Sequence, residues 1–189
     1  IGRFLGWFYA NPKYNMQKPG YRPKIVIGKD TRRSSYMLEY AVAAGAASSG
    51  ADVELLHVTT TPSVSYIVRQ DCFDCGVMIT ASHNPFYDNG IKVINGNGEK
   101  LEDGVAYLAE AYLDKDFKTL GLDGEDDLPF AKRGDIGTIN DYSSGRNRYI
   151  GYLISLAKHS MKKLIIGLDT ANGASWMIAK SVFEALGAQ

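Results

Sequence analysis

The sequence predicts an α/β fold built on a mostly parallel sheet. Three short apolar runs, each bounded by turn residues, are typical of buried strands and occupy residues 24–28, 52–58 and 76–80. The segments between these runs have the apolar spacing and the end residues of helices. Because strand and helix alternate, we expect parallel strands joined by right-handed crossovers, with the carboxyl ends of the strands at one edge of the sheet.

The composition is that of an ordinary globular domain and limits the classes of partner. The 189 residues suffice for one domain or one and a half, with 45% hydrophobic and 22% charged residues. The 21 basic and 21 acidic residues cancel, so no overall field favours nucleic acid or a membrane surface. No apolar run of about 18 residues and no signal sequence is visible, although the chain does not begin with Met. We therefore expect a cytoplasmic protein with a small-molecule partner and with no nucleic-acid or membrane partner.

The two predicted crossover helices have recognisable ends. Ser34 or Ser35 can cap a helix that runs towards Gly50, because serine is a favoured cap and glycine a natural stop. Pro62 favours the start of the second helix, and the apolar residues of 64–68 keep helical spacing. Both helices therefore begin just after a strand ends.

Further elements are expected on either side of these units. Residues 1–9 have the pattern of the later part of an amphipathic helix. Beyond the third strand we expect a hairpin with a glycine turn over residues 91–101 and a helix over 103–113. An irregular stretch over 118–137 and a second helix over 141–158 should follow.

The last part of the chain has the pattern of a new βα unit. A strand is expected over 163–168 and a helix over 175–186. A lone strand has no ladder partners and cannot build a core, so we expect the chain to be a fragment of a longer protein. The predicted domains are 1–158, which is a first domain, and 159–189, which is the incomplete beginning of a second.

A serine lies at the most informative position, just after the strand over 76–80. Ser82 is followed by the turn dipeptide Asn84-Pro85, so its hydroxyl should lie on a loop at the edge of the sheet where ligands bind. His83 and Lys92 can move protons or neutralise an anion nearby. The flanking alanine and histidine do not match the Gly-x-Ser-x-Gly elbow of hydrolases. The alternative is an ordinary surface turn.

The residues around Ser82 resemble the phosphoserine loop of the α-D-phosphohexomutases. The version that reads Asp-Asn-Gly-Ile-Lys is most similar to that of the bacterial phosphoglucosamine mutases within the family. The matching segments run along nearly the whole chain and occupy residues 28–35, 61–62, 76–79, 80–85, 87–92 and 169–174. The resemblance implies a three-layer α/β/α domain with a mixed, mostly parallel sheet, followed by the start of a similar second domain.

The resemblance also implies roles for particular residues. Ser82 would carry the phosphoryl group, Lys92 would transfer a proton or stabilise charge, and His83 would contact the phosphate or orient the loop. Arg32 and Asn84 would bind substrate or phosphate, and Arg32 could also pair with its neighbour Asp30. One Mg²⁺ ion would be bound through the phosphate on Ser82. The aspartates of an Asp-Gly-Asp-x-Asp-Arg loop, which would complete that site, do not occur in this sequence.

The function implied by the resemblance is the interconversion of glucosamine 6-phosphate and glucosamine 1-phosphate, with a sugar 1,6-bisphosphate as activator. The chain by itself is expected to be inactive, because it lacks the family's metal-binding and sugar-binding domains. One alternative is a phosphomannomutase or phosphoglucomutase of the same family. Another alternative is a non-catalytic domain that binds sugar phosphates.

Two further groups could carry chemistry but have weak sequence signals. Cys72 and Cys75 form a C-x-x-C pair that suits a redox protein, but the pair precedes a strand rather than a helix, so we expect two reduced thiols. His57 and His159 have no clustered partner in the sequence, so we expect structural or surface roles for both.

Overall fold

A twisted sheet forms the centre of the structure. The computed structural model describes residues 1–14 and 20–189, and the sheet that these residues form has the strand order β4-β3-β1-β2-β5. The strands are β1 (Lys24–Lys29), β2 (Asp52–Val58), β3 (Cys75–Ile79), β4 (Ile91–Asn95) and β5 (Ile139–Asp141). Strand β1 pairs in parallel with β2 and β3, β5 pairs in parallel with β2, and β4 is antiparallel to β3. The predicted mixed, mostly parallel sheet is confirmed.

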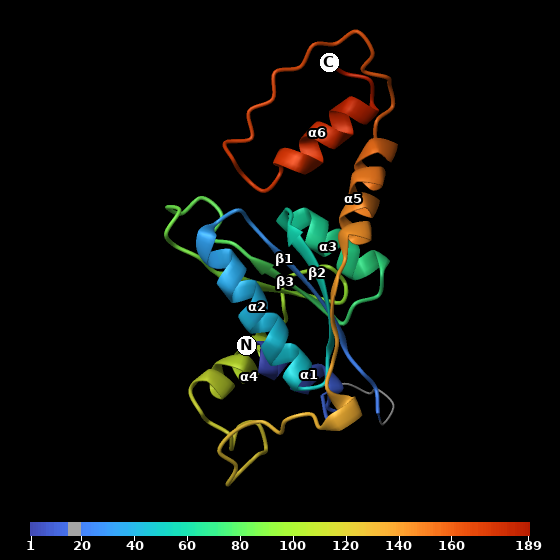
Figure 1. The fold of residues 1–189 in the computed structure, drawn as a ribbon. Coiled ribbons are helices and arrows are strands. Elements are labelled where there is room, and N and C mark those ends of the chain that lie inside the picture. Colours follow the sequence, from blue (N-terminus) through green and yellow to red (C-terminus); the bar gives the residue numbers. More distant parts are fainter. Residues whose placement is uncertain (15–19) are drawn as a thin grey trace.

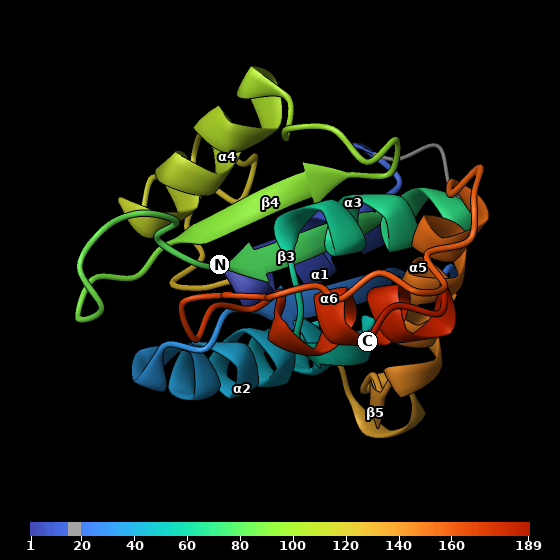
Figure 2. The same ribbon diagram turned by 90° about the horizontal axis from the view of Figure 1, so that it is seen from above.

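Helices cover both faces of this sheet, as Figures 1 and 2 show. They are α1 (Gly2–Ala10), α2 (Arg33–Ser48), α3 (Thr61–Gln70), α4 (Asp103–Leu113), α5 (Ser143–Ser155) and α6 (Trp176–Ala185), with a short 3₁₀ turn at Arg133–Asp135. Helices α1, α2 and α4 pack on one face, and α3 packs on the other, so the fold has three layers. Of the helices described, none has the length and apolar character needed to cross a bilayer.

The central strands are apolar on both faces because a helix layer covers each face. In β1, Ile25 and Ile27 belong to the core under α1 and α2, whereas Val26 belongs to the core under α3. All three side chains are fully buried. The alternation follows from the period of two in a strand, and a continuous apolar run is what a strand buried on both faces requires.

Two glycines let α3 pack closely on the sheet. A Cβ atom at Gly28 of β1 would lie 2.6 Å from a methyl carbon of Val64, and one at Gly76 of β3 would lie 2.5 Å from a methyl carbon of Val68. Such distances are far inside van der Waals contact, and both valines are buried. Because these two glycines have no side chains, α3 can lie close to the sheet, and its first turn lies near the carboxyl edge.

Most elements lie where the sequence predicts them, but the expected strand over 163–168 is wrong. These residues are irregular, and Ile165 is 88% exposed. The amide of Ile166 donates to the carbonyl of Gln189, and the amide of Gln189 donates to the carbonyl of Leu164, so the segment pairs with the end of the chain and not with a strand. The physical reason is that an extended segment without a neighbouring strand has no ladder hydrogen bonds to stabilise it.

The structure gives His57 carboxylate partners that the sequence does not reveal, one of which lies on the additional short strand β5. His57 is close to two carboxylates, with its Nδ1 3.2 Å from Glu39 and its Nε2 2.8 Å from Asp141 of β5. Glu39 in turn pairs with Lys29 at 2.9 Å, and both are almost completely buried. The Lys29 ammonium also lies over the ring of Tyr36. A backbone φ of 55° at His57, beside a register shift between β1 and β2, turns the imidazole towards these partners.

The close packing of α3 gives a stability prediction. We expect Gly76→Ala to lower the free energy of unfolding by about 1–3 kcal/mol, because the new methyl group overlaps buried valines. Gly104→Ala in α4 is the matched control, since a Cβ there meets nothing within 4 Å, and it should be neutral or slightly stabilising. Urea unfolding of the two variants measures the difference, and equal midpoints would contradict this account of α3.

Candidate active site

The loop that carries Ser82 lies at the carboxyl edge of the sheet, where it joins β3 to β4. The loops after β1 and β2 reach the same edge, and a cavity of about 690 Å³ opens between them. The turn at 171–175, just before α6, closes the other side of this cavity. The hydroxyl of Thr31 donates to the carbonyl of Asn172 at 3.0 Å and joins the two sides. Ser82 therefore lies at the carboxyl edge of the sheet, where the sequence predicts its loop.

Three helices begin at this cavity. Arg33 starts α2, Thr61 starts α3 and Ser175 precedes α6, and all three residues line the cavity wall. The residues at the N-cap positions, which are Arg32, Thr60 and Ser175, make no capping hydrogen bond with their side chains. Their uncapped N–H groups and the positive ends of their dipoles favour an anion in the space between them. The cavity is thus suited to a phosphate group although the chain has no net charge.

Ser82 is exposed and has an unusual backbone conformation. Its φ is 53°, which is the left-handed region that residues with a side chain rarely adopt. Its amide donates to the hydroxyl oxygen of Thr80 at 3.0 Å. The side chain lines the cavity, so the loop presents the hydroxyl to the same space that the helix ends face.

Lys92 reaches Ser82 from the neighbouring strand. Its position on β4, directly across from Met78 of β3, brings it beside the loop that connects the two strands. The Nζ atom of Lys92 donates to the Ser82 hydroxyl oxygen at 2.7 Å. A nucleophilic hydroxyl next to an amine is an arrangement that can support both proton transfer and the stabilisation of a charged phosphate. The structure brings together the two residues that the sequence motif singles out.

Asp30, at the end of β1, is a buried acceptor that organises the loops. One carboxylate oxygen accepts from the amide of Arg32 and the hydroxyl of Ser35, and the other accepts from Nε of Arg32 and the hydroxyl of Thr80. Burial alone would raise the pKa of this carboxyl, but the donors, led by the Arg32 amide, outweigh it and hold the pKa below the usual value of 3.8. Asp30 is therefore ionised and fully engaged.

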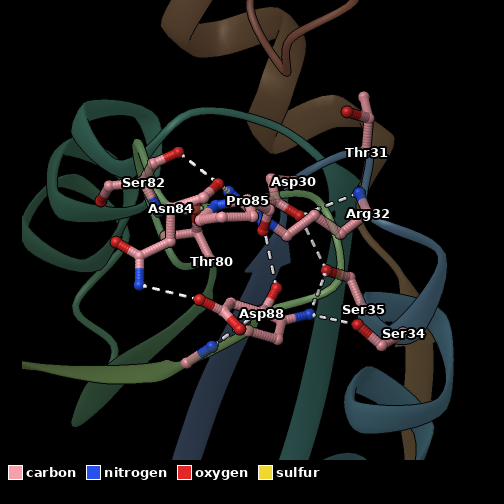
Figure 3. A network of polar contacts seen from close by, with 12 residues as sticks. Asp30, Thr31, Arg32, Ser34, Ser35, Thr80, Ser82, Asn84, Pro85 and Asp88 are labelled. Atoms are coloured by element: carbon pink, nitrogen blue, oxygen red, sulfur yellow. Dashed lines mark hydrogen bonds and ion pairs between the residues drawn. The ribbon is translucent and has the colours of Figure 1, made fainter.

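Arg32 lies beneath the serine loop and bonds to its backbone. Its guanidinium donates to Asp30 and to the carbonyl oxygens of Ser82, Asn84, Pro85 and Asp88. Figure 3 shows these partners gathered around the arginine side chain. The sequence left open whether Arg32 pairs with Asp30 or joins an anion site, and in the structure the ion pair is formed at 2.8 Å.

Asn84 and His83 are exposed on the same loop but have different surroundings. Asn84 lines the cavity, and its side-chain amide donates to the carboxylate of Asp88 at 3.2 Å. His83 is adjacent to Ser82 in the chain but does not line the cavity. Of the predicted site residues, Ser82, Arg32 and Asn84 thus line the cavity, whereas Lys92 contacts Ser82 without lining it and His83 lies outside the cavity wall.

The far end of the loop rests on α2 through contacts that sequence reasoning missed. The Asn89 side-chain amide donates to the hydroxyls of Ser34 and Ser35, both at 2.9 Å, while its oxygen accepts from the amide of Gly90. The prediction that one of these serines caps the helix is wrong, because α2 begins at Arg33 and both serines lie within it. A run of two serines after Asp-Thr-Arg-Arg, facing a loop rich in amides, was the available signal that they bind the loop instead.

A magnesium site is not completed by the residues around Ser82. Asp30 is the carboxylate that lines the cavity, and four donors already occupy its oxygens. Over residues 1–14 and 20–189 no group of three His, Cys, Asp or Glu side chains is placed to hold a metal ion. Since Mg²⁺ prefers octahedral oxygen ligation, the Ser82 oxygen without further ligands does not fit such a site.

The C-x-x-C pair has the properties of structural thiols. Both cysteines are free, with Cys72 exposed and Cys75 buried in β3. Burial raises the pKa of the Cys75 thiol, whereas a reactive cysteine requires a lowered pKa. The pair lies at the start of β3, at the opposite end of that strand from Ser82.

Residues 10–119 match the family model described as phosphoglucomutase/phosphomannomutase, alpha/beta/alpha domain I. The chain belongs to this phosphohexomutase family. The matched range contains Ser82, Lys92 and the Asp30-Arg32 pair, so the resemblance drawn from the loop motifs is confirmed. The three-layer arrangement of the fold agrees with the description of the family domain.

Curated relatives are named phosphoglucosamine mutase. One from Lachnospira eligens is 56% identical over 189 residues, and one from Bacillus subtilis is 40% identical over 188 residues. Each comparison covers 100% of this chain and 39% of the relative, so the chain spans about two fifths of the length of these proteins.

Solved structures share the fold at lower identity. A phosphoglucomutase/phosphomannomutase family protein from Burkholderia thailandensis superposes with a TM-score of 0.71 at 20% identity, covering 100% of this chain and 38% of that one. The parafusin of Paramecium, a phosphoglucomutase, superposes with a TM-score of 0.68 at 18% identity, with the same coverage of both chains. At these identities the likeness concerns the fold alone.

The left-handed backbone of Ser82 gives a prediction that is independent of activity. We expect Ser82→Gly to be more stable than Ser82→Ala by about 1 kcal/mol, because glycine adopts a φ of 53° without a steric cost. Both variants lose the hydroxyl, so their comparison isolates the backbone term. Thermal unfolding of the two proteins measures it, and an alanine variant as stable as the glycine variant would show that the conformation is not strained.

Proposed function

We propose that this chain provides the phosphoserine loop of a phosphoglucosamine mutase, which interconverts glucosamine 6-phosphate and glucosamine 1-phosphate. The observation that carries the proposal is the contact of 2.7 Å between Lys92 and the hydroxyl of Ser82. It lies beside a cavity that three helix N-termini make favourable to an anion. The curated relatives with this name support the choice of glucosamine phosphate as substrate.

In the proposed reaction Ser82 carries a phosphoryl group between two oxygens of one sugar. A sugar hydroxyl attacks the phosphorus of phosphoserine, the bond to the serine oxygen breaks, and the serine oxygen takes up a proton. The bisphosphorylated sugar then turns over and returns the other phosphoryl group to Ser82. Because such transfer depends mainly on positioning and on stabilising charge, the lysine and the helix ends would supply much of what this domain contributes.

The remaining groups are assigned by their places around the cavity. We propose that Asn84, which lines it, contacts the substrate or the phosphate. His83 is proposed to orient the loop or to reach the phosphate from outside the cavity wall. The sequence suggests either phosphate binding or pairing with Asp30 for Arg32, and its donors are engaged with Asp30 and the loop.

The chain is proposed to act as part of a larger protein. A Mg²⁺ ion bound through the phosphate on Ser82 would need carboxylates from elsewhere, because Asp30, the carboxylate that lines the cavity, is already engaged. Sugar selection is likewise assigned to parts not present in this chain, so the chain alone should have no mutase activity. The proposed activator is a sugar 1,6-bisphosphate, and the proposed location is the cytoplasm.

The test uses the full-length protein that carries this chain, with Mg²⁺ and a trace of sugar 1,6-bisphosphate. We expect faster turnover of glucosamine 6-phosphate than of glucose or mannose 6-phosphate, and a loss of turnover in Ser82→Ala. Mass spectrometry should find the phosphate on Ser82. A preference for glucose or mannose would keep the mechanism and replace the substrate, while no turnover of any of the three would favour a non-catalytic binding domain.

The role of Lys92 is tested by two substitutions of similar length. Lys92→Met should lower kcat by about 100-fold or more, because the reacting oxygen loses its proton donor and its cation. Lys92→Arg restores a permanent charge but cannot readily accept a proton. Recovery in the arginine variant would assign charge stabilisation to Lys92, continued loss would assign proton transfer, and an active methionine variant would contradict both.

A further inference from the structure

The guanidinium of Arg32 has no donor left for a substrate. An arginine carries five N–H groups. In the structure Nε donates to Asp30, Nη1 donates to the carbonyls of Pro85 and Asp88, and Nη2 donates to those of Ser82 and Asn84. The side chain borders the cavity but is only 10% exposed. To bind a phosphate, Arg32 would have to release the loop that carries the nucleophile.

The loop depends on these bonds because it is not held by apolar packing of its own side chains. Its two large apolar residues, Phe86 and Tyr87, are 83% and 71% exposed, so the loop has no apolar core of its own. Four of its carbonyls instead converge on one charged group in its interior. Hydrogen bonds from a charged donor are stronger than those between neutral groups, so the guanidinium takes the place that a buried side chain has in an ordinary loop.

The same contacts fix the backbone on both sides of the Ser82 side chain. The amide of Ser82 donates to the hydroxyl of Thr80, and its carbonyl accepts from Arg32 at 3.0 Å. Thr80 and Arg32 are in turn both bonded to Asp30. The uncommon φ of 53° at Ser82 therefore lies between two hydrogen bonds that lead back to one carboxylate.

We propose that Arg32, oriented by Asp30, is a positioning residue that holds Ser82 in its left-handed conformation, and that it is not a phosphate ligand. This role replaces the direct phosphate contact that the sequence suggested for Arg32. What Ser82 does once positioned rests on the proposed function, whereas the positioning itself concerns only the loop.

Arg32→Lys separates the two roles because lysine keeps the charge but not the planar, five-donor fork. In the full-length, unphosphorylated protein without substrate, we expect amide exchange in the loop 81–89 to speed up by about tenfold or more. We expect kcat for the mutase reaction to fall by about 100-fold, since small displacements of a reacting group cost that much. The KM for the sugar phosphate should change little.

Two controls keep the result interpretable. Arg69→Lys changes an exposed arginine in the last turn of α3, away from the loop, and should alter neither measurement. If Arg32→Lys fails to fold, amide exchange of the unphosphorylated wild type with and without saturating inorganic phosphate replaces it, because Arg32 could bind phosphate only by releasing the loop. Exchange in the loop 81–89 should then stay the same or slow down when phosphate is added.

Unchanged loop exchange in Arg32→Lys, or faster loop exchange of the wild type on adding phosphate where that measurement replaces it, would overturn the proposal. A raised KM with an undisturbed loop would also overturn it and return Arg32 to phosphate binding. Faster exchange in a protein whose wild type turns over no sugar phosphate would uphold the positioning role and reject the proposed function, so the two failures are distinguishable.

Discussion

The carboxylate of Asp30 is the acceptor on which the geometry of the site depends. It lies at the end of β1 and holds donors from the turn after that strand, from α2 and from Thr80 after β3. An ionised group with few water contacts is stable only when its hydrogen bonds are complete. The same four bonds that make the buried charge tolerable therefore fix the three segments relative to one another.

This arrangement resolves a conflict between exposure and order. Under the proposed function Ser82 must protrude to meet a sugar, and residues 82–87 of its loop are exposed. A protruding loop is normally mobile because it buries little apolar surface. Here the Arg32 guanidinium, bonded to four carbonyls of the loop, orders the backbone in place of an apolar core. The side chain of Ser82 stays accessible to Lys92 and, under the proposed function, to substrate.

The sequence predicted the strands, the sheet edge and the serine because each has a local signal. Buried strands have apolar runs, and the loop motif is continuous from 80 to 92. The features that the sequence did not predict correctly depend on partners far away in the sequence. The segment 163–168 has strand composition but no neighbouring strand, and β5 is three exposed residues whose pairing with β2 no local pattern reveals. The contact of His57 with its carboxylates depends on the register shift between β1 and β2, which no local pattern predicts. The partners of the Arg32 guanidinium depend on the conformation of the whole serine loop.

The end of β1 joins the site to the stable part of the fold. Lys29 pairs with Glu39 of α2, and the next residue, Asp30, bonds to Ser35 of the same helix. A fully buried ion pair contributes little net stability, since desolvation offsets attraction, but losing one partner is costly. Its effect is to fix how α2 sits on β1. Because the side chain of Asn89, at the far end of the serine loop, also bonds to α2, the position of Ser82 depends on the packing of β1 against α2.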